Sequence, residues 1–276
     1  MSNGFICPKC GDFLNRNENS LKCLKNHCYD LAASGYVNLL LSDMMNSKLP
    51  GDNKLMVNAR RSFLSKGFYK PLADAFAETV VKYSGNGCTI LDAGCGEGYY
   101  TGIIAECLAS DGKSADIFGI DISKNAVNAA AKRYKDISFA AASIFHLPFG
   151  DGSCDILATL FAPYCGDEFL RVLKKGGIMV MAIPGERHLW GLKKAVYDKL
   201  YLNEVKDYAL DGFEFIGTDK LSYTISLDNA EDIRSLFSMT PYYYKTSEEG
   251  HKRLEALVSL ETEVSFEILT YRKIGG

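Results

Sequence analysis

The stretch that most constrains the fold is residues 90–101, with the sequence ILDAGCGEGYYT. Apolar residues lead into Asp92, a glycine-rich turn follows, and an apolar pattern with helical spacing continues to Leu108. Glycine permits positive φ angles and lets a ligand approach the main chain closely. The free N–H groups of a first helical turn favour an anion. The stretch therefore predicts a buried strand, a tight turn and a helix N-terminus that together bind a ligand.

The spacing of the glycines narrows the class of ligand. The dinucleotide fingerprint requires a third glycine at the position that Tyr99 occupies. The pattern D-x-G-x-G-x-G instead resembles motif I of class I S-adenosylmethionine (SAM) methyltransferases. An acid at the end of the next predicted strand is suited to bind ribose hydroxyls. From this motif and the following strand ends we predict cofactor-binding residues at Asp92, Gly94, Cys95, Gly96, Glu97, Gly98, Asp121, Ile122 and Ser143.

Strand and helix patterns alternate along the chain around this motif. Alternation of this kind predicts a parallel, doubly wound sheet with ligands at the carboxyl ends of its strands. Together with the resemblance to motif I, this alternation predicts the fold class α/β, a Rossmann-like class I SAM methyltransferase with a seven-stranded, mostly parallel sheet. The cysteine pattern described below adds a small N-terminal zinc-binding domain. The expected strands lie near residues 88–93, 116–121, 137–142, 154–160, 177–183, 213–225 and 263–271, and the expected helices near 98–110, 123–134, 165–173 and 189–200.

Length and composition limit the number of domains, the kind of partner and the cellular location that we expect. A chain of 276 residues suits one large domain plus an appendage, and a formal charge of −3 does not by itself indicate a nucleic-acid partner, although a local basic patch remains compatible with one. No apolar run is long enough to span a bilayer, and the N-terminus lacks the blocks of a signal peptide. We therefore expect a cytoplasmic protein whose nine cysteines are thiols or metal ligands.

The N-terminal cysteines have the spacing of a metal site. The pattern C-x2-C-x12-C-x3-H consists of two close pairs separated by a dozen residues, which fits a tetrahedral zinc site. We assign Cys7, Cys10, Cys23 and His27 as the ligands, with Cys28 as the competitor for the fourth place. Four protein ligands leave no open coordination position, so the predicted role is structural. Such a short segment needs the metal for much of its folding free energy.

The segment between the two predicted domains is less regular. Residues 36–41 are expected to form a strand under the zinc lobe, 42–54 a loop, and 58–67 a helix, with a further amphipathic helix from Pro71 to Tyr83. The proposed division is 1–35 for the zinc-binding domain, 36–70 for a connector and 71–276 for the methyltransferase domain. Near the C-terminus, the aromatic cluster at residues 238–245 is interpreted as loop residues that pack on the core.

The order of these motifs resembles the RlmA family, which methylates N1 of a guanine in 23S ribosomal RNA. The matching stretches span nearly the whole chain and are CPKC, the C-x3-H that continues into YDLAASGYVNLL, ARRSFLSKGFYKPL, LDAGCGEGYYT, AAAKRY, HLPFGDGSCD, FAP, PGERHL and MTP. Cys28 is a departure from the family pattern. The resemblance implies a 23S rRNA hairpin as substrate, a homodimer, and SAM contacts at Tyr69, Gly96, Glu97 and His188. It leaves open which of two neighbouring guanines is modified.

The reaction requires in-line alignment of N1, methyl and sulfur, and removal of the N1 proton from an unstacked base. No strong general base is evident, and the candidates by position are Asp167, Glu168 and His188. The lobe and connector are expected to bind RNA phosphates through Lys9, Arg16, Lys22, Lys25, Lys48, Arg60 and Arg61. Two alternatives are a methyltransferase acting on a small molecule and a non-catalytic RNA-binding protein with a relic SAM fold. For the basic stretch Arg60, Arg61, Lys66 and Lys70, a solvated helix face competes with an RNA contact.

Overall fold

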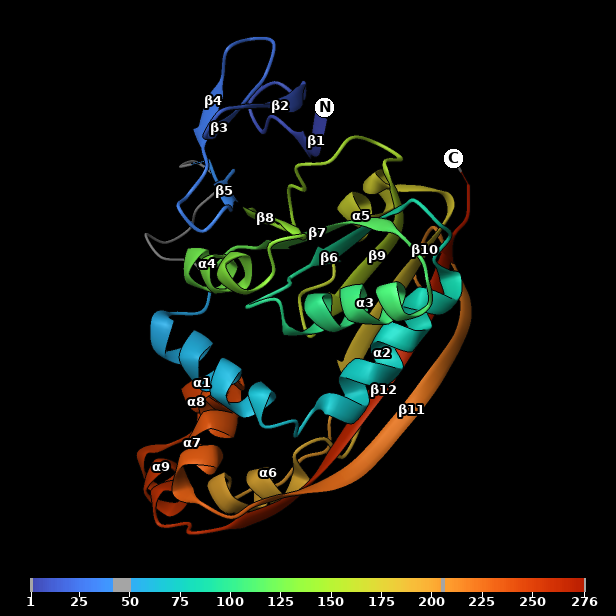
Figure 1. The fold of residues 1–276 in the computed structure, drawn as a ribbon. Coiled ribbons are helices and arrows are strands. Elements are labelled where there is room, and N and C mark those ends of the chain that lie inside the picture. Colours follow the sequence, from blue (N-terminus) through green and yellow to red (C-terminus); the bar gives the residue numbers. More distant parts are fainter. Residues whose placement is uncertain (1, 42–50, 205–206, 276) are drawn as a thin grey trace.

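The computed structural model describes residues 2–41, 51–204 and 207–275. Figure 1 shows a small N-terminal β-lobe at the top, a larger α/β domain below it, and a group of helices at the bottom left. The lobe is a four-stranded antiparallel sheet in the order β1-β2-β3-β4. Its strands are β1 (Ser2–Ile6), β2 (Phe13–Asn17), β3 (Ser20–Lys22) and β4 (Cys28–Asp30).

The lobe shares its hydrophobic core with the larger domain. Phe5 is buried and makes edge-on contacts with Phe118 and Phe149, at centroid distances of 5.2 and 5.3 Å. The Ile6 N–H donates a hydrogen bond to the Pro148 carbonyl at 2.9 Å. Removing the lobe would expose these aromatic faces to water, so the lobe and the domain depend on each other for stability.

The main sheet has the order β11-β12-β10-β9-β6-β7-β8-β5. Every pairing from β10 to β5 is parallel, whereas β12 is antiparallel to both of its neighbours. The strand order reverses at β6, whose two neighbours are β7 and β9, and ligands bind at such a switch point. The strands are β5 (Val37–Asn38), β6 (Cys88–Ala93), β7 (Ala115–Asp121), β8 (Ser138–Ala141), β9 (Cys154–Leu160), β10 (Leu173–Pro184), β11 (Phe213–Leu227) and β12 (Leu260–Lys273).

Both faces of this sheet are covered by other parts of the fold. Successive residues of each strand point to opposite faces, so each strand contributes to two cores. Ile90, Ile156 and Val180 belong to the core beneath α2 (Lys70–Tyr83) and α3 (Tyr99–Ser110). Leu91 and Met179 belong to a second core, which includes the N-terminal lobe and α5 (Gly166–Val172). The helix α4 (Lys124–Arg133) covers the end of the sheet at β7 and β8.

The remaining helices surround the carboxyl ends of the strands. Helix α6 (Trp190–Val196) follows β10, and three helices are inserted between β11 and β12. The inserted helices are α7 (Ala230–Ser238), α8 (Tyr242–Lys245) and α9 (Glu248–Glu255). Helix α1 (Lys54–Ser65) packs against α7, and Lys66 forms an ion pair with the buried Asp232. Figure 1 shows α1, α7 and α8 together, on the side of the sheet opposite the N-terminal lobe.

The predicted class I methyltransferase fold is confirmed, with some differences in the elements. The strand expected at 36–41 to lie under the zinc lobe is reduced to β5, which instead pairs with β8 as an eighth strand of the main sheet, among the residues described. Burial of Val37 and Leu39 against that sheet accounts for the difference. The connector helix begins earlier than expected, where the Asn53 side chain caps the Met56 N–H. In the described part of the chain, no helix is long and apolar enough to cross a membrane.

Candidate active site and metal centre

The glycine turn after β6 requires its glycines. Gly94, Gly96 and Gly98 have φ angles of 93°, 56° and 82°, a region that favours glycine. A Cβ atom on Gly94 would lie 2.6 Å from the Cβ of Ala162, and one on Gly98 would lie 2.9 Å from the Cβ of Ala130. The turn therefore packs closely against both the loop after β9 and helix α4, which leaves no space for a side chain at Gly94 or Gly98.

A cavity of about 650 Å³ opens in front of this turn, at the carboxyl ends of the strands. Residues from the turn, the loops after β7, β8, β9 and β10, the connector and the inserted helices all line it. The predicted cofactor residues that line it are Tyr69, Gly94, Cys95, Gly96, Glu97, Asp121, Ile122, Ser143 and His188. The fold thus brings together residues that are up to 119 positions apart in the chain.

Two residues predicted to bind the cofactor lie behind the cavity wall instead. Asp92 is buried and accepts a hydrogen bond from the Thr101 hydroxyl at 2.5 Å, and burial raises its pKa to about 7. Gly98 is the N-cap of α3, and its N–H donates to the Cys95 carbonyl at 3.0 Å. Neither residue is part of the lining. Asp92 Oδ2 and the Gly98 N–H form hydrogen bonds within this region and hold the turn in shape, whereas Asp92 Oδ1 is buried without a partner.

Asp121 lies at the end of β7 and faces the cavity. Its Oδ2 accepts the Gly96 N–H at 3.0 Å, and its Oδ1 accepts the Ser123 N–H at 2.8 Å. Burial raises the pKa of this carboxyl, and the two N–H donors act in the opposite direction. A carboxylate has about four acceptor positions, so both oxygens retain the capacity to accept a hydroxyl.

Two buried polar atoms at the cavity have no hydrogen-bond partner in the described structure. They are the Tyr69 hydroxyl and Oε1 of Glu97. Burial raises the pKa of Glu97 to about 7, while Arg133, Arg60 and Arg61 lower it. Unpaired buried polar groups are costly, and in native proteins they usually await a ligand or a water. These two atoms therefore fit the polar groups of a bound cofactor such as SAM.

His188 lies in the loop between β10 and α6, and its ring is buried against Phe266 at a centroid distance of 4.8 Å. The Ser265 N–H donates to His188 Nδ1 at 3.3 Å, and burial lowers the pKa of the imidazole to about 3. The ring is therefore neutral at physiological pH. Because Nδ1 is an acceptor, the proton resides on Nε2, and this nitrogen is a hydrogen-bond donor rather than a base.

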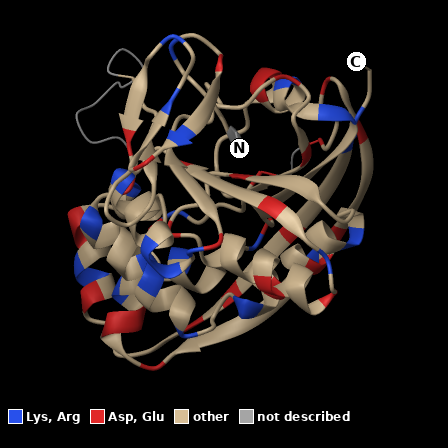
Figure 2. Cartoon of the chain, turned by 45° about the horizontal axis from the view of Figure 1, so that its top comes forward, with Lys and Arg blue, Asp and Glu red and all other residues tan. Residues whose placement is uncertain are grey.

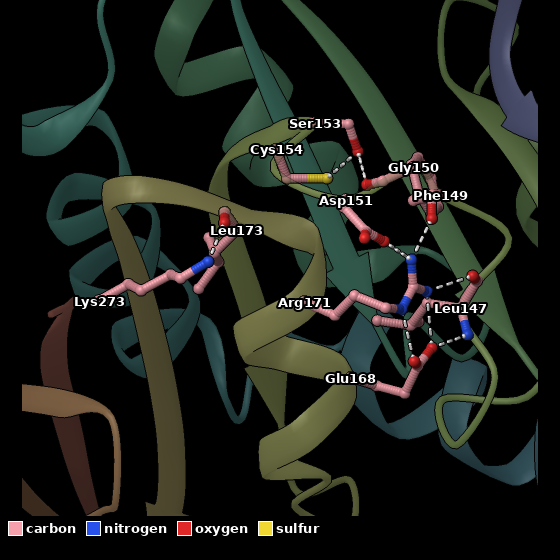
Figure 3. A network of polar contacts seen from close by, with 10 residues as sticks. All are labelled: Leu147, Phe149, Gly150, Asp151, Ser153, Cys154, Glu168, Arg171, Leu173 and Lys273. Atoms are coloured by element: carbon pink, nitrogen blue, oxygen red, sulfur yellow. Dashed lines mark hydrogen bonds and ion pairs between the residues drawn. The ribbon is translucent and has the colours of Figure 1, made fainter. Parts of the chain in front are cut away.

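The other two general-base candidates lie away from the cavity. Glu168 is bound to Arg171 by a two-pronged ion pair with contacts of 2.6 and 2.8 Å, and it also accepts the Leu147 N–H at 2.5 Å. Figure 3 shows this network, in which Arg171 also contacts Asp151 and the Phe149 carbonyl. Glu168 thus fastens the loop after β8 to α5. Asp167 is exposed, and neither acid lines the cavity.

Sequence reasoning missed the part of the cavity wall that comes from distant segments. Residues 239–242 and Tyr244, interpreted from the sequence as loop residues packing on the core, line the cavity from the inserted helices. Asp52 and Arg60 also line it and form an ion pair. Three lining aromatic residues are substantially exposed, namely Phe145, Phe161 and Tyr244, at 61, 45 and 67%. Exposed aromatic side chains around one opening provide stacking surfaces for a planar ligand.

Phe161 stands out within this group because its backbone is strained. It follows β9 directly and has a φ angle of 55°, which is rare for a bulky residue. Its ring lies nearly parallel to that of His188, with an interplanar angle of 26°. Strained residues of this kind concentrate at functional sites. In the sequence, Phe161 could be noticed as the first residue of the FAP stretch. The backbone strain at this residue was not predictable from the sequence.

The N-terminal lobe brings Cys7, Cys10, Cys23 and His27 together, with all ligand atoms within 4.8 Å of one another. His27 Nδ1 lies 3.4 Å from both the Cys7 and the Cys23 Sγ, and the Sγ atoms of Cys10 and Cys23 are 3.6 Å apart. A tetrahedral zinc ion with ordinary bond lengths requires edges of about 3.8 Å between sulfurs and about 3.6 Å between sulfur and nitrogen. The donor set and its spacing therefore fit zinc. Cys28 is exposed on β4 and lies outside this group.

The expected RNA-binding cations are distributed over the lobe and the connector. Figure 2 shows Lys and Arg on the lobe and over the helices below it, with Asp and Glu among them. On the lobe, Lys25 lies 3.9 Å from Asp12. In the connector, Arg60, Lys66 and Lys70 each pair with an aspartate, so much of the connector charge is locally compensated. Lys48 lies outside the described residues.

The sheet order, the glycine turn and the cavity define a class I SAM-dependent methyltransferase. A methyltransferase-domain family model matches residues 84–229, and the model described as RlmA, N-terminal, matches residues 5–48. The chain is 32% identical to a 23S rRNA (guanine(748)-N(1))-methyltransferase from Streptomyces fradiae, over 81% of this chain and 80% of that one. It is 30% identical, over 96 and 95% of the two chains, to a Bacillus subtilis protein provisionally named as a 23S rRNA (guanine-N(1)-)-methyltransferase, YxjB.

The chain therefore belongs to the RlmA family of 23S rRNA (guanine-N1)-methyltransferases. It is a SAM-dependent rRNA methyltransferase that uses zinc in its N-terminal lobe.

Proposed function

We propose that this enzyme methylates N1 of one guanine in a hairpin of 23S rRNA, and that the guanine corresponds to position 748. The position is supported by the name of the Streptomyces fradiae relative. The observation that carries the rest of the proposal is the cavity of about 650 Å³, which combines unpaired polar atoms at its base with exposed aromatic rings at its opening. The volume is in the range of a small-molecule site, and the rings suit a flat base.

In this proposal the cofactor occupies the inner part of the cavity. Asp121 accepts the ribose hydroxyls, since its two oxygens retain acceptor capacity. Glu97 and Tyr69 bind the amino-acid end of the cofactor, because their unpaired polar atoms need partners there. The remaining proposed cofactor contacts are Gly94, Cys95, Gly96, Ile122, Ser143 and His188, whereas Asp92 and Gly98 support the turn.

The target guanine occupies the outer part and stacks on Phe161. An N1 atom inside a base pair is blocked, so the base must leave its stack before it reaches the cavity. SAM supplies an activated methyl group, and alignment of N1 with that methyl contributes most of the catalysis. The acids that line the cavity are Glu97, Asp121 and Asp52, and the last is paired with Arg60. Because His188 is neutral and donates through Nε2, it can stabilise negative charge on the guanine while water accepts the N1 proton.

The N-terminal residues 1–35 act in RNA recognition, residues 36–70 connect, and residues 71–276 form the methyltransferase domain. Support comes from the zinc ligand set Cys7, Cys10, Cys23 and His27, which leaves no open coordination position for chemistry. Lys9, Arg16 and Lys22 offer positive charge on the lobe. A homodimer and a cytoplasmic location, where ribosomal RNA is processed, belong to the same proposal.

The test uses purified enzyme, labelled SAM and three RNA substrates. The first is a transcript of the 23S hairpin, the second replaces the guanine equivalent to 748 with adenine, and the third replaces the neighbouring guanine. We expect methylation of the first and third transcripts, with the added mass mapped to N1 of one guanine. Methylation of the second transcript would refute the position. No methylation of any RNA, together with turnover of a small-molecule acceptor, would refute the substrate class.

A further inference from the structure

A second cavity, here called the seam pocket, lies where the N-terminal lobe meets the methyltransferase domain. It has a volume of about 170 Å³ and shares no lining residue with the cofactor cavity. Its polar lining comes from three parts of the fold. Arg16 is on β2 of the lobe, and Ser34 is in the turn before β5. Lys135 lies in the connection between α4 and β8, and Ser138 is the first residue of β8.

The charge of the seam pocket is positive and uncompensated. Among the described residues, neither Arg16 nor Lys135 has a carboxylate within 4 Å, and no acidic side chain lines the pocket. Lys135 Nζ donates to the Ser34 and Ala131 carbonyls at 3.2 and 2.7 Å, which are neutral acceptors. The cation is thus held in place at the pocket wall without a counter-charge. This contrasts with Lys25 on the same lobe, which has Asp12 nearby.

A buried hydroxyl in the same pocket also lacks a partner. Ser34 is 9% exposed, and its Oγ makes no hydrogen bond in the described structure. A buried hydroxyl without a partner destabilises a fold, so its presence beside two unpaired cations calls for an acceptor that the protein itself does not provide. A ligand that satisfies all three groups must be anionic, must present several oxygen acceptors and must be small.

We propose that the seam pocket binds a backbone phosphate of the substrate RNA. A phosphodiester has the required charge and oxygen acceptors, and two cations with a hydroxyl are a common way to bind it. The volume of the pocket is sufficient for one phosphate group. The inference rests on the proposed function, because the rRNA hairpin is the ligand. Binding at the seam would contact the lobe and the methyltransferase domain at once, and would position the RNA stem relative to the catalytic cavity.

The experiment compares four full-length, zinc-loaded variants with the wild type. Arg16→Met and Lys135→Met remove one charge each, and Ser34→Ala removes the unpaired hydroxyl. Lys82→Met is the matched control, because Lys82 is an exposed lysine on α2 that lines neither cavity. Binding of the hairpin is measured from 50 to 300 mM salt, and SAM affinity and Tm are measured in parallel. Each lost phosphate contact lowers the slope of log K against log salt by about 0.7–0.9.

We expect Arg16→Met and Lys135→Met each to weaken hairpin binding by roughly tenfold and to reduce the salt slope, with unchanged SAM affinity. Ser34→Ala should weaken RNA binding while raising Tm, because it removes an unsatisfied buried hydroxyl. A merely structural role would not produce these opposite effects. The control should leave both affinity and slope within twofold of the wild type.

The inference is overturned if the wild type binds the hairpin and the three pocket variants match the Lys82→Met control in affinity and salt slope. A second result would also overturn it. Inorganic phosphate would raise the Tm of the wild type but not of Ser34→Ala, while Ser34→Ala and the wild type would bind the hairpin equally well. The pocket would then bind a free anion and not the RNA. Failure of the wild type to bind or methylate the hairpin would instead count against the proposed function.

Discussion

Replacement of Glu97 by glutamine should remove a pH dependence from SAM binding. Glu97 is 3% exposed at the cavity, its Oε1 has no partner, and burial raises its pKa to about 7. SAM is a cation and favours the ionised carboxylate. Binding therefore lowers the pKa of Glu97 and releases a proton, and the affinity rises as the pH increases toward the pKa of the free protein.

The magnitude follows from the ionised fraction. With a pKa of about 7, roughly a tenth of Glu97 is ionised at pH 6 and roughly three quarters at pH 7.5, so the affinity of the wild type should rise about eightfold over this range. Above pH 7.5 the gain levels off. The variant loses a charge-assisted hydrogen bond of about 1.5–3 kcal/mol, so at pH 7.5 its affinity should fall by roughly ten- to a hundredfold.

Isothermal titration calorimetry at several pH values, in buffers of different ionisation enthalpy, measures both the affinity and the protons released. Glu106→Gln is the matched control, because Glu106 is exposed on α3, the helix that follows the turn containing Glu97. We expect the wild type and this control to release close to one proton at pH 6, and Glu97→Gln to release none. Equal proton release from all three proteins would show that Glu97 does not contact the cofactor.

Three further predictions concern the cofactor, the metal and the target base. Asp121→Ala should reduce SAM affinity by roughly ten- to a hundredfold, because the ribose loses a charged acceptor, and unchanged calorimetry would contradict that role. His27→Ala should lose zinc and Cys28→Ser should retain it, as measured by metal content, since only His27 reaches the other three ligands. Phe161→Gly relieves the positive φ angle and removes the ring, so it should raise the KM for the RNA with no change in SAM affinity. An unchanged KM would exclude stacking on Phe161.

The sequence was most informative where local constraints determine the structure. The glycines of the turn after β6 adopt φ angles that favour glycine, and the alternation of strand and helix patterns along the chain identified the parallel sheet. Asp121 could be located because an acid ends the strand after the motif. The four metal ligands were identifiable because two close pairs of residues, separated by a dozen positions, are the spacing that a tetrahedral zinc site commonly uses.

Features that depend on tertiary contacts were not predictable in this way. Asp92 belongs to the motif, yet its bond to Thr101 turns it into a support for the turn. Arg60 reaches the cavity only because α1 packs against α7, which lies far along the chain. The helices α7–α9 are inserted between β11 and β12, the two strands expected near the C-terminus. Their aromatic residues line the cavity only because the pairing of these strands places the insertion there.

The packing of Phe5 between Phe118 and Phe149 limits how lobes can be exchanged between relatives. A chimaera that joins the zinc lobe of one family member to the catalytic domain of another would place foreign side chains in a single shared interior. Swaps that carry the partner aromatic residues along with the lobe should yield folded hybrids, whereas swaps cut at residue 35 should not. Transfer of RNA specificity between relatives would thus require the contact residues on both sides of the seam to move together.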